Sequence, residues 1–222
     1  MLYLVPTPIG NMEDMTYRGV AILKEVDLIL AEDTRTSKHL LDKYEVSTKV
    51  ISFHAHNEHS KLSGLIQDLE SGMNIALISD AGTPGISDPG FLLVREAVKH
   101  DIPVTCLPGS TAMIPAVVMS GIPCDRFHFE GFLPQKKGKK TRLEFLLSLP
   151  NAFVIYESPY RVVKTLKRIM EMTEVERQVC VCREISKIHE ESIRGLMSEV
   201  IEDLESRSSI KGEIVIVVSG NV

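Results

Sequence analysis

The sequence lacks the features that mark several classes of protein. It has no tryptophan, only 5% aromatic residues, and 4 cysteines that form no C-x-x-C pair. Cysteines this sparse exclude a disulfide scaffold, so we expect reduced core thiols. The three histidines at positions 54, 56 and 59 have no second His/Cys pair to complete a metal site, and we expect no metal.

Long apolar runs are also absent. No stretch approaches the roughly 18–20 apolar residues that cross a bilayer, and the first residues show no basic region followed by an apolar core. We therefore expect a cytoplasmic protein that does not bind membranes. Neither a G-x-G-x-x-G nor a Walker A sequence occurs, which argues against a dinucleotide or nucleoside-triphosphate site.

Charge is unevenly distributed along the chain. The net charge is −5, but residues 1–114 hold 9 basic against 15 acidic side chains, and residues 115–222 hold 16 against 15. A polyanionic partner should therefore meet the second half first.

The order of short apolar runs and helical patterns predicts an α/β protein. In the first half, residues 2–5, 28–31, 49–53, 75–79 and 104–107 are expected strands, and residues 17–25, 37–44, 59–70 and 89–100 are expected helices. Strands separated by single helices imply a mainly parallel sheet. In the second half we expect strands over 127–130, 153–156, 179–183 and 214–219, with helices over 158–172 and 196–204. We predict two α/β domains, residues 1–114 and 115–222, with a cleft between them.

The most informative segment is residues 78–90, ISDAGTPGISDPG, which writes Ile-Ser-Asp-X-Gly twice. It follows an apolar strand and precedes a helix, the position where open α/β sheets hold ligands. We expect Asp80 to face a ligand. Asp88 should instead cap the next helix, with Pro89 at its first position.

Other strand ends carry small or charged residues. Residues 6–11 (PTPIGN) and 108–112 (PGSTA) would let a ligand approach the backbone, and the second of these opens a helix. Glu32, Asp33 and Arg35 follow the second strand, and His56 follows the third. We expect the three charged residues to position a substrate or activate one of its hydroxyls, with an N-cap and a local ion pair as the alternative for Asp33 and Arg35. We expect the loop at His56 to face the substrate, and surface histidines of no special role remain the alternative.

A basic run follows in the second half. Residues 134–142 place five cations within seven positions, which is either a solvated flexible loop or a contact for a phosphate backbone. The candidate nucleic-acid contacts are Lys136, Lys137, Lys139, Lys140 and Arg142.

These motifs, in this order, resemble the ribosomal RNA small subunit methyltransferase I family of the tetrapyrrole methylase superfamily. The resemblance rests on LYLVPTPIGN, AEDTR, ISDAGTPGISDPG, PGSTA, FEGFLP, YESPYR, REISK and KGEIVIVV and covers nearly the whole chain. It implies a homodimer that binds S-adenosylmethionine in the interdomain cleft and methylates the 2′-oxygen of a cytidine in 16S ribosomal RNA, as free RNA or in the 30S particle. S-adenosylhomocysteine would be the product.

Carried over by position, the resemblance also implies a set of site residues. The cofactor contacts are Pro8, Asp80, Gly82, Thr83, Ile86, Thr111, Ala112, Glu157, Ile185, Ser186, Gly212 and Glu213. For deprotonating the ribose hydroxyl or orienting the nucleotide, the candidates are Glu32, Asp33, Arg35 and His56.

The chain departs from the family at two places. Tyr160 stands in YESPYR where a histidine is common, and the sequence ends just after the last expected strand, where many members carry a further segment. Two other functions stay open: methylation of a porphyrin or corrin ring, and a non-catalytic cofactor-binding protein of ribosome assembly.

Overall fold

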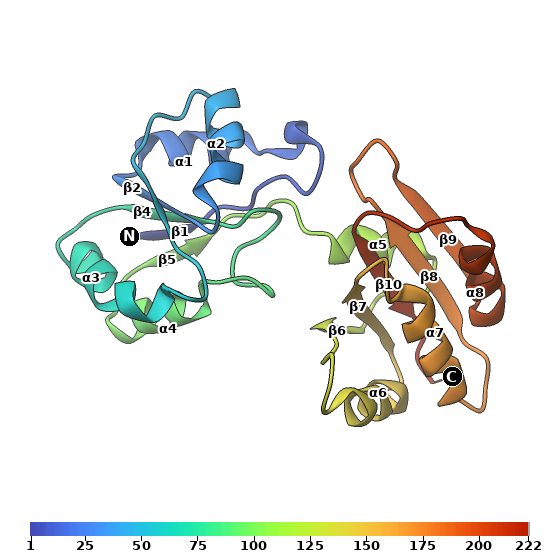
Figure 1. Cartoon of the computed structure of the whole chain (residues 1–222). Helices are drawn as coiled ribbons and strands as arrows, with labels where there is room; N and C mark the ends of the chain where they lie inside the picture. Colours follow the sequence, from blue (N-terminus) through green and yellow to red (C-terminus); the bar gives the residue numbers. More distant parts are fainter. Residues whose placement is uncertain (222) are drawn as a thin grey trace. The chain divides into compact units, whose positions relative to one another are not determined.

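The computed structural model describes residues 1–221. The chain divides into two compact units, Met1–Thr111 and the residues from Ala112 on. Each unit has one five-stranded sheet with helices on both faces (Figure 1). The prediction of two α/β domains is confirmed at the level of fold class.

The sheet of the first unit is wholly parallel, in the order β3-β2-β4-β1-β5. Its strands are β1 (Leu2–Leu4), β2 (Leu28–Ala31), β3 (Val50–Ser52), β4 (Ile75–Ile78) and β5 (Val104–Cys106). Every residue of β2 and β4 is buried, because a parallel sheet covered on both faces leaves its central strands no solvent side.

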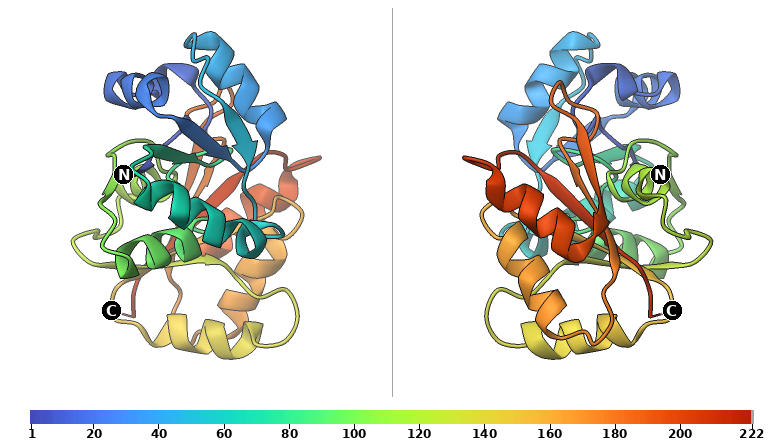
Figure 2. Two further views of the ribbon diagram at one scale, coloured as in Figure 1. Left: turned by 90° about the vertical axis from the view of Figure 1, so that its left-hand side faces the viewer. Right: turned by 90° about the vertical axis from the view of Figure 1, so that its right-hand side faces the viewer.

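Helices cover both faces of this sheet, as the left view of Figure 2 shows. The helices are η1 (Met12–Asp14), α1 (Tyr17–Glu25), α2 (Thr34–Lys43), α3 (Glu58–Glu70) and α4 (Phe91–Lys99). Leu28 and Leu30 pack with α3 and α4, whereas Ile29 and Ala31 pack with α1 and α2. The side-chain period of two along a strand thus supplies two separate apolar cores.

The sheet of the second unit is mixed, in the order β6-β7-β10-β8-β9, with only β6 and β7 parallel. The strands are β6 (Phe127–Phe132), β7 (Ala152–Glu157), β8 (Gln178–Arg183), β9 (Glu191–Leu196) and β10 (Ile214–Val218). The helices are α5 (Met113–Ser120), α6 (Lys139–Ser148), α7 (Val162–Glu171) and α8 (Met197–Ser206).

One large core fills the space between this sheet and three of its helices. Leu143 and Leu146 of α6, Leu166 of α7 and Val200 of α8 all pack on the same sheet face, and α7 and α8 lie side by side in the right view of Figure 2. On the other face α5 packs against β8 and β10.

The four cysteines differ in their surroundings. Cys180 and Cys182 are buried in the second unit as free thiols, while Cys106 and Cys124 are exposed free thiols. The expectation of reduced core thiols therefore holds for two of the four.

Two predicted helix starts are wrong. Helix α4 begins at Phe91 rather than at Pro89, because its N-cap is Gly90, whose φ of 128° ends a non-helical loop. Asp88 therefore does not cap it. Helix α7 begins at Val162 rather than after Ser158, whose carbonyl instead accepts from the Arg161 amide at 2.9 Å and closes a turn before the helix.

No helix within residues 1–221 has both the length and the apolar character needed to cross a membrane.

Candidate functional site

Strands β1 and β4 lie side by side, but the helices that follow them leave toward opposite faces of the sheet. Helix α1 packs on one core, through Leu23, and α4 on the other, through Leu93. Such a reversal marks the carboxyl ends of the two strands as the place where ligands bind in open α/β sheets. The loops at this place are residues 5–11 and 79–90.

Backbone hydrogen bonds join these two loops. Thr7 and Gly82 each donate an amide hydrogen to the other's carbonyl oxygen, both at 2.9 Å. The buried Thr7 hydroxyl donates to the carbonyl of Ser79 at 3.0 Å, and the Ser79 hydroxyl donates to the carbonyl of Gly82 at 3.1 Å. Each of these polar groups has a hydrogen-bond partner within the two loops. The loops therefore hold each other in place, and we call residues 5–11 and 79–90 together the floor of the site.

The loop after β5 joins the same floor. The Thr83 hydroxyl donates to the carbonyl of Ser110 at 3.0 Å. Gly109 lies so close to Pro6 that a Cβ at this position would come within 2.7 Å of the proline Cβ. Only glycine permits that approach. The three loops with small residues, each predicted separately, are therefore in contact within the first unit.

Three carboxylates gather around this floor. The Asp33 amide donates to Asp80 Oδ1 at 3.1 Å, and the charges of Asp80 and Glu32 act on Asp88. Burial, followed by repulsion from Glu32 and Asp80, raises the pKa of Asp88 to about 6. Burial and the charge of Asp80 also raise the pKa of Glu32. Within the described chain no lysine or arginine pairs with Glu32, Asp80 or Asp88. The site is electronegative.

Asp33 and Arg35 are engaged with each other. Asp33 Oδ1 caps helix α2 by accepting from the Arg35 amide at 2.8 Å, and the Arg35 guanidinium donates to both carboxylate oxygens at 3.1 and 2.7 Å. These hydrogen bonds hold the pKa of Asp33 well below its usual range. Because Asp33 and Arg35 pair with each other, Glu32 is the one of these three charged residues without an ion pair in the described chain.

The segment that carries His54, His56 and His59 also contains Glu58, whose carboxylate has a structural role. Buried Glu58 accepts from the amides of Gly90 and Leu92, both at 3.3 Å, and so caps helix α4 in place of Asp88. His54 contacts Asn57 through Nε2 at 3.1 Å, while its buried Nδ1 has no hydrogen-bond partner among the residues that the structure describes. His56 is exposed, with its ring centroid 6.0 Å from that of His54.

In the second unit Glu157 is a fully satisfied buried carboxylate. One oxygen accepts from the Ser158 amide at 2.7 Å and from Arg161 Nε at 2.9 Å. The other accepts from the Thr165 hydroxyl at 2.8 Å and lies 3.8 Å from Lys139 Nζ. These donors saturate its side chain, which leaves the strand-end backbone as the part of Glu157 that can contact a ligand.

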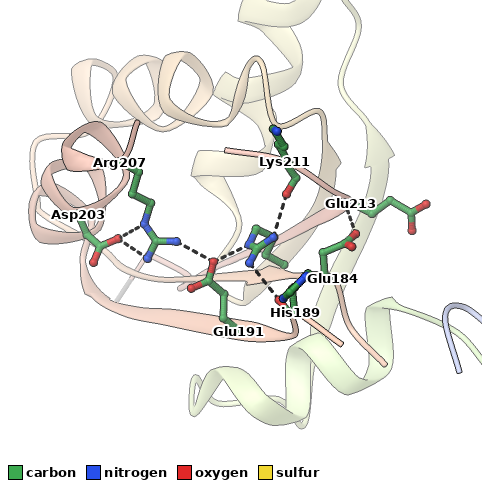
Figure 3. A network of polar contacts seen from close by, with 8 residues as sticks. Glu184, His189, Glu191, Asp203, Arg207, Lys211 and Glu213 are labelled. Carbon is green, nitrogen blue, oxygen red and sulfur yellow. Dashed lines mark hydrogen bonds and ion pairs between the residues drawn. The ribbon is translucent and has the colours of Figure 1, made fainter. Parts of the chain in front are cut away.

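Hydrogen bonds join the segment that follows strand β8 to the segment that precedes strand β10, and we call these two segments the tied loops. Glu184 Oε1 accepts from the Glu213 amide at 2.9 Å (Figure 3). It also accepts from Lys187 Nζ at 3.0 Å, and the Glu184 amide donates to the Glu213 carbonyl. The bond to Glu213 is the first of the interactions that lower the pKa of Glu184. The tied loops carry four predicted cofactor contacts, namely Ile185, Ser186, Gly212 and Glu213.

A series of connected ion pairs holds the segments next to the tied loops in place. Glu191 Oε1 accepts from Arg183 at 2.5 Å and from Arg207 at 2.7 Å, and Arg207 also pairs with Asp203 at 2.7 Å (Figure 3). Arg183 donates in addition to the carbonyls of His189 and Lys211. Both guanidinium groups are occupied and serve to position the loops.

The predicted RNA-binding cations divide into two groups. Lys136 and Lys137 are exposed and have no partner among the described residues. Lys139 donates to Thr165 at 2.9 Å, and Lys140 lies 3.7 Å from Glu144. Arg142 donates to Glu130 at 2.5 Å and lies over the Phe145 ring, with 4.6 Å between Arg142 Cζ and the ring centroid. The sequence predicts a loop here, but from Lys139 on the segment is helix α6.

A hollow of about 410 Å³ lies elsewhere in the second unit, against Arg177, Gln178 and Arg194. It contains none of the predicted site residues. Among residues 1–221 no cluster of His, Cys, Asp and Glu could hold a metal ion.

Solved structures of other proteins share the fold of this chain. Diphthine synthase matches with a TM-score of 0.77 at 13% identity, over 99% of this chain and 89% of that one. Uroporphyrin-III C-methyltransferase from Thermus thermophilus, complexed with S-adenyl homocysteine, matches with a TM-score of 0.65 at 18% identity, over 97% and 96%. The fold is thus one that methyltransferases use.

The sequence comparisons narrow this class to a family. The family model for tetrapyrrole (corrin/porphyrin) methylases matches residues 1–201. A protein of Streptococcus pyogenes serotype M3 is 48% identical over 99% of this chain and 76% of its own length, and one of Hydrogenobaculum sp. is 45% identical over 98% and 95%. Each is named ribosomal RNA small subunit methyltransferase I. The chain belongs to the tetrapyrrole methylase family, as the motifs predicted.

Family membership confirms two expectations at once. The protein is a methyltransferase, and S-adenosylmethionine is the methyl donor of its family. The three joined loops of the first unit fit such a donor, because Asp80 and Asp88 have no ion-pair partner among the described residues and suit a cationic sulfonium.

Proposed function

We propose that this protein transfers a methyl group from S-adenosylmethionine to the ribose 2′-oxygen of a cytidine in small-subunit (16S) ribosomal RNA. The observation that carries the proposal is 45–48% identity, over nearly the whole chain, to proteins named ribosomal RNA small subunit methyltransferase I. The electronegative floor and the exposed lysines of the second unit support it. We further propose a homodimer that acts in the cytoplasm.

Each unit by itself carries some of the proposed donor contacts. Pro8, Asp80, Gly82, Thr83 and Ile86 come from the joined floor of the first unit. Thr111 and Ala112 lie at the border of the two units. The tied loops at Glu184 and Glu213, with the strand end at Glu157, supply the contacts from the second unit.

The bound donor supplies an electrophilic methyl group on a positively charged sulfur. The chain's part is to hold the ribose oxygen in line with that methyl, since alignment of two reactants alone accelerates a reaction greatly. The carboxylates of Asp80 and Asp88, which no lysine or arginine of the described chain neutralises, would suit a positively charged group of the donor.

Of the four predicted acid–base candidates, Glu32 fits the task of accepting the hydroxyl proton. A carboxylate whose pKa burial has raised is a stronger base than one at its ordinary value, and Glu32 is not paired with a cation. Asp33 and Arg35 are held by each other, and we assign them to orienting the loop. His56 remains a candidate for contacting the nucleotide.

The test is methyl transfer from labelled S-adenosylmethionine to purified 30S particles and to free 16S RNA. We expect transfer by the wild-type protein, and loss of donor binding by calorimetry in Asp80→Ala. Lys136→Ala/Lys137→Ala should bind the donor normally but engage RNA weakly. Transfer to a porphyrin or corrin ring instead of RNA, or donor binding without any transfer, would refute the proposal.

A further inference from the structure

We propose that Tyr160 is a stacking platform for an unpaired base of the RNA, and that Lys136, Lys137 and Lys164 contact the phosphates beside it. We call these four residues the Tyr160 surface. The inference rests on the proposed function for the kind of substrate, and it adds a binding surface in the second unit.

The Tyr160 ring is exposed on a backbone that is held firmly. Its side chain lies in solvent, with 92% of the residue accessible. Its amide donates to the Ser158 hydroxyl at 3.3 Å, and the Arg161 amide donates to the Ser158 carbonyl at 2.9 Å. The carboxylate of Glu157 fixes both flanks of the turn by accepting from Ser158 and Arg161. A ring presented in this way loses little entropy when a partner packs on it.

Cations flank this turn, since Arg161 and Lys164 follow it in the chain and Lys139 Nζ lies 3.8 Å from the carboxylate of Glu157, which precedes it. Lys139 is bonded to Thr165 in the second turn of α7, so the loop that carries Lys136 and Lys137 enters α6 beside the start of α7. Burial, and then the nearby charges of Arg161 and Lys164, lower the pKa of Lys139 even though Glu157 opposes the shift. Lys139, Arg161 and Lys164 are thus close enough to repel one another.

The nearby acid offsets only part of this positive charge. Glu157 is buried, and its single negative charge is shared between Lys139 and Arg161. Lys136, Lys137 and Lys164 are exposed and have no ion pair among the described residues. An exposed aromatic ring with unpaired lysines on neighbouring segments is a combination that binds single-stranded nucleic acid, where bases stack and phosphates pair with cations.

The ring also selects the form of RNA. In an A-form duplex the base faces are stacked on each other, and only unpaired nucleotides can lie against a side chain. We therefore expect the Tyr160 surface to prefer a loop or single strand over a helix. Since stacking needs only a flat ring, phenylalanine or histidine at this position should serve as well as tyrosine.

The first experiment measures binding of the full-length protein to a fluorescent single-stranded RNA of about 12 nucleotides, a length within the site sizes of such proteins. Tyr160→Ala should weaken binding about 5- to 150-fold, the range that corresponds to stacking of one base. Tyr160→Phe and Tyr160→His should stay near wild type. Tyr17→Ala is the matched control, because Tyr17 is 98% exposed but lies in the first unit.

The second experiment separates stacking from charge. Lys136→Ala/Lys137→Ala should reduce the slope of log affinity against log salt by about 1.4, since each phosphate contact to a single strand contributes about 0.7. Tyr160→Ala should leave this slope unchanged. Equal affinity of Tyr160→Ala and wild type, or Tyr160→Phe as weak as Tyr160→Ala, would overturn the inference.

Methyl transfer distinguishes the inference from the proposed function. If the wild-type protein methylates no RNA but its RNA binding still depends on Tyr160, the proposed function fails and the Tyr160 surface stands. If 30S particles are methylated, Tyr160→Ala should raise KM and leave kcat near wild type. Methylation with an unchanged KM would contradict the Tyr160 surface alone.

Discussion

Replacing Asp88 by asparagine should stabilise the protein at neutral pH and change its stability little at pH 4. Burial and the charges of Glu32 and Asp80 raise the pKa of Asp88 from its ordinary value of 3.8 to about 6. Between these two values the folded state binds more protons than the unfolded state. The free energy of unfolding of the wild-type protein therefore falls as the pH rises through this window. Asparagine removes this dependence because it carries no charge.

The size of the effect follows from the shift and from the exposure of the group. In a dry site such a shift would correspond to about 3 kcal/mol. Asp88 is only half-buried, so solvent screens its neighbours, and we expect a gain of about 1 kcal/mol at pH 7.5.

The assay is urea unfolding followed by circular dichroism at pH 4 and at pH 7.5, without cofactor. Asp125→Asn is the matched control, since the Asp125 side chain is 81% exposed and its variant should change stability little at either pH. A gain of equal size at both pH values, or a loss at pH 7.5, would refute the electrostatic account of the three carboxylates.

Two other predictions concern buried acids. Glu157→Gln should lower the free energy of unfolding by about 2 kcal/mol, because it leaves Lys139 without its counter-charge. Glu144→Gln is the control, since it removes an exposed ion pair with Lys140 and should lower the free energy of unfolding by less than about 0.5 kcal/mol. Equal losses in urea unfolding would contradict this. Glu58→Ala should cost about 1–2 kcal/mol by uncapping helix α4, and Glu58→Gln less than half of that, since the amide oxygen still accepts. An equal cost for both Glu58 variants would rule out the cap.

The buried strands could be predicted from the sequence because their apolar runs allow few alternatives. Strands β2 and β4 have no solvent face, and the predicted ranges at 28–31 and 75–79 fall on them. Strand β9 was missed. Its residues ESIRGL mix polar and apolar types, and it is held by pairing with β8 rather than by its own pattern. Helix α6 was also missed, because its basic first turn hides the apolar Leu143 and Leu146.

The residue types that form the site could be predicted from the sequence, but the hydrogen-bond partners of each side chain could not. Glycine, serine and aspartate after strand β4 indicated a ligand loop, and the other strand ends followed from a parallel sheet. Nothing in the spacing indicated that Glu58 rather than Asp88 caps helix α4. That choice depends on a carboxylate 32 residues away from Gly90 reaching its amide. Asp88 is thereby left without a capping role and is repelled by Glu32 and Asp80.

The central claim is tested most directly by mass spectrometry of small-subunit ribosomal RNA from a strain that lacks this protein. The account predicts the loss of one 2′-O-methylcytidine, restored by the wild-type gene and not by Asp80→Ala. An unchanged methylation pattern in the deletion strain would contradict the claim and favour a protein that binds the cofactor without catalysis.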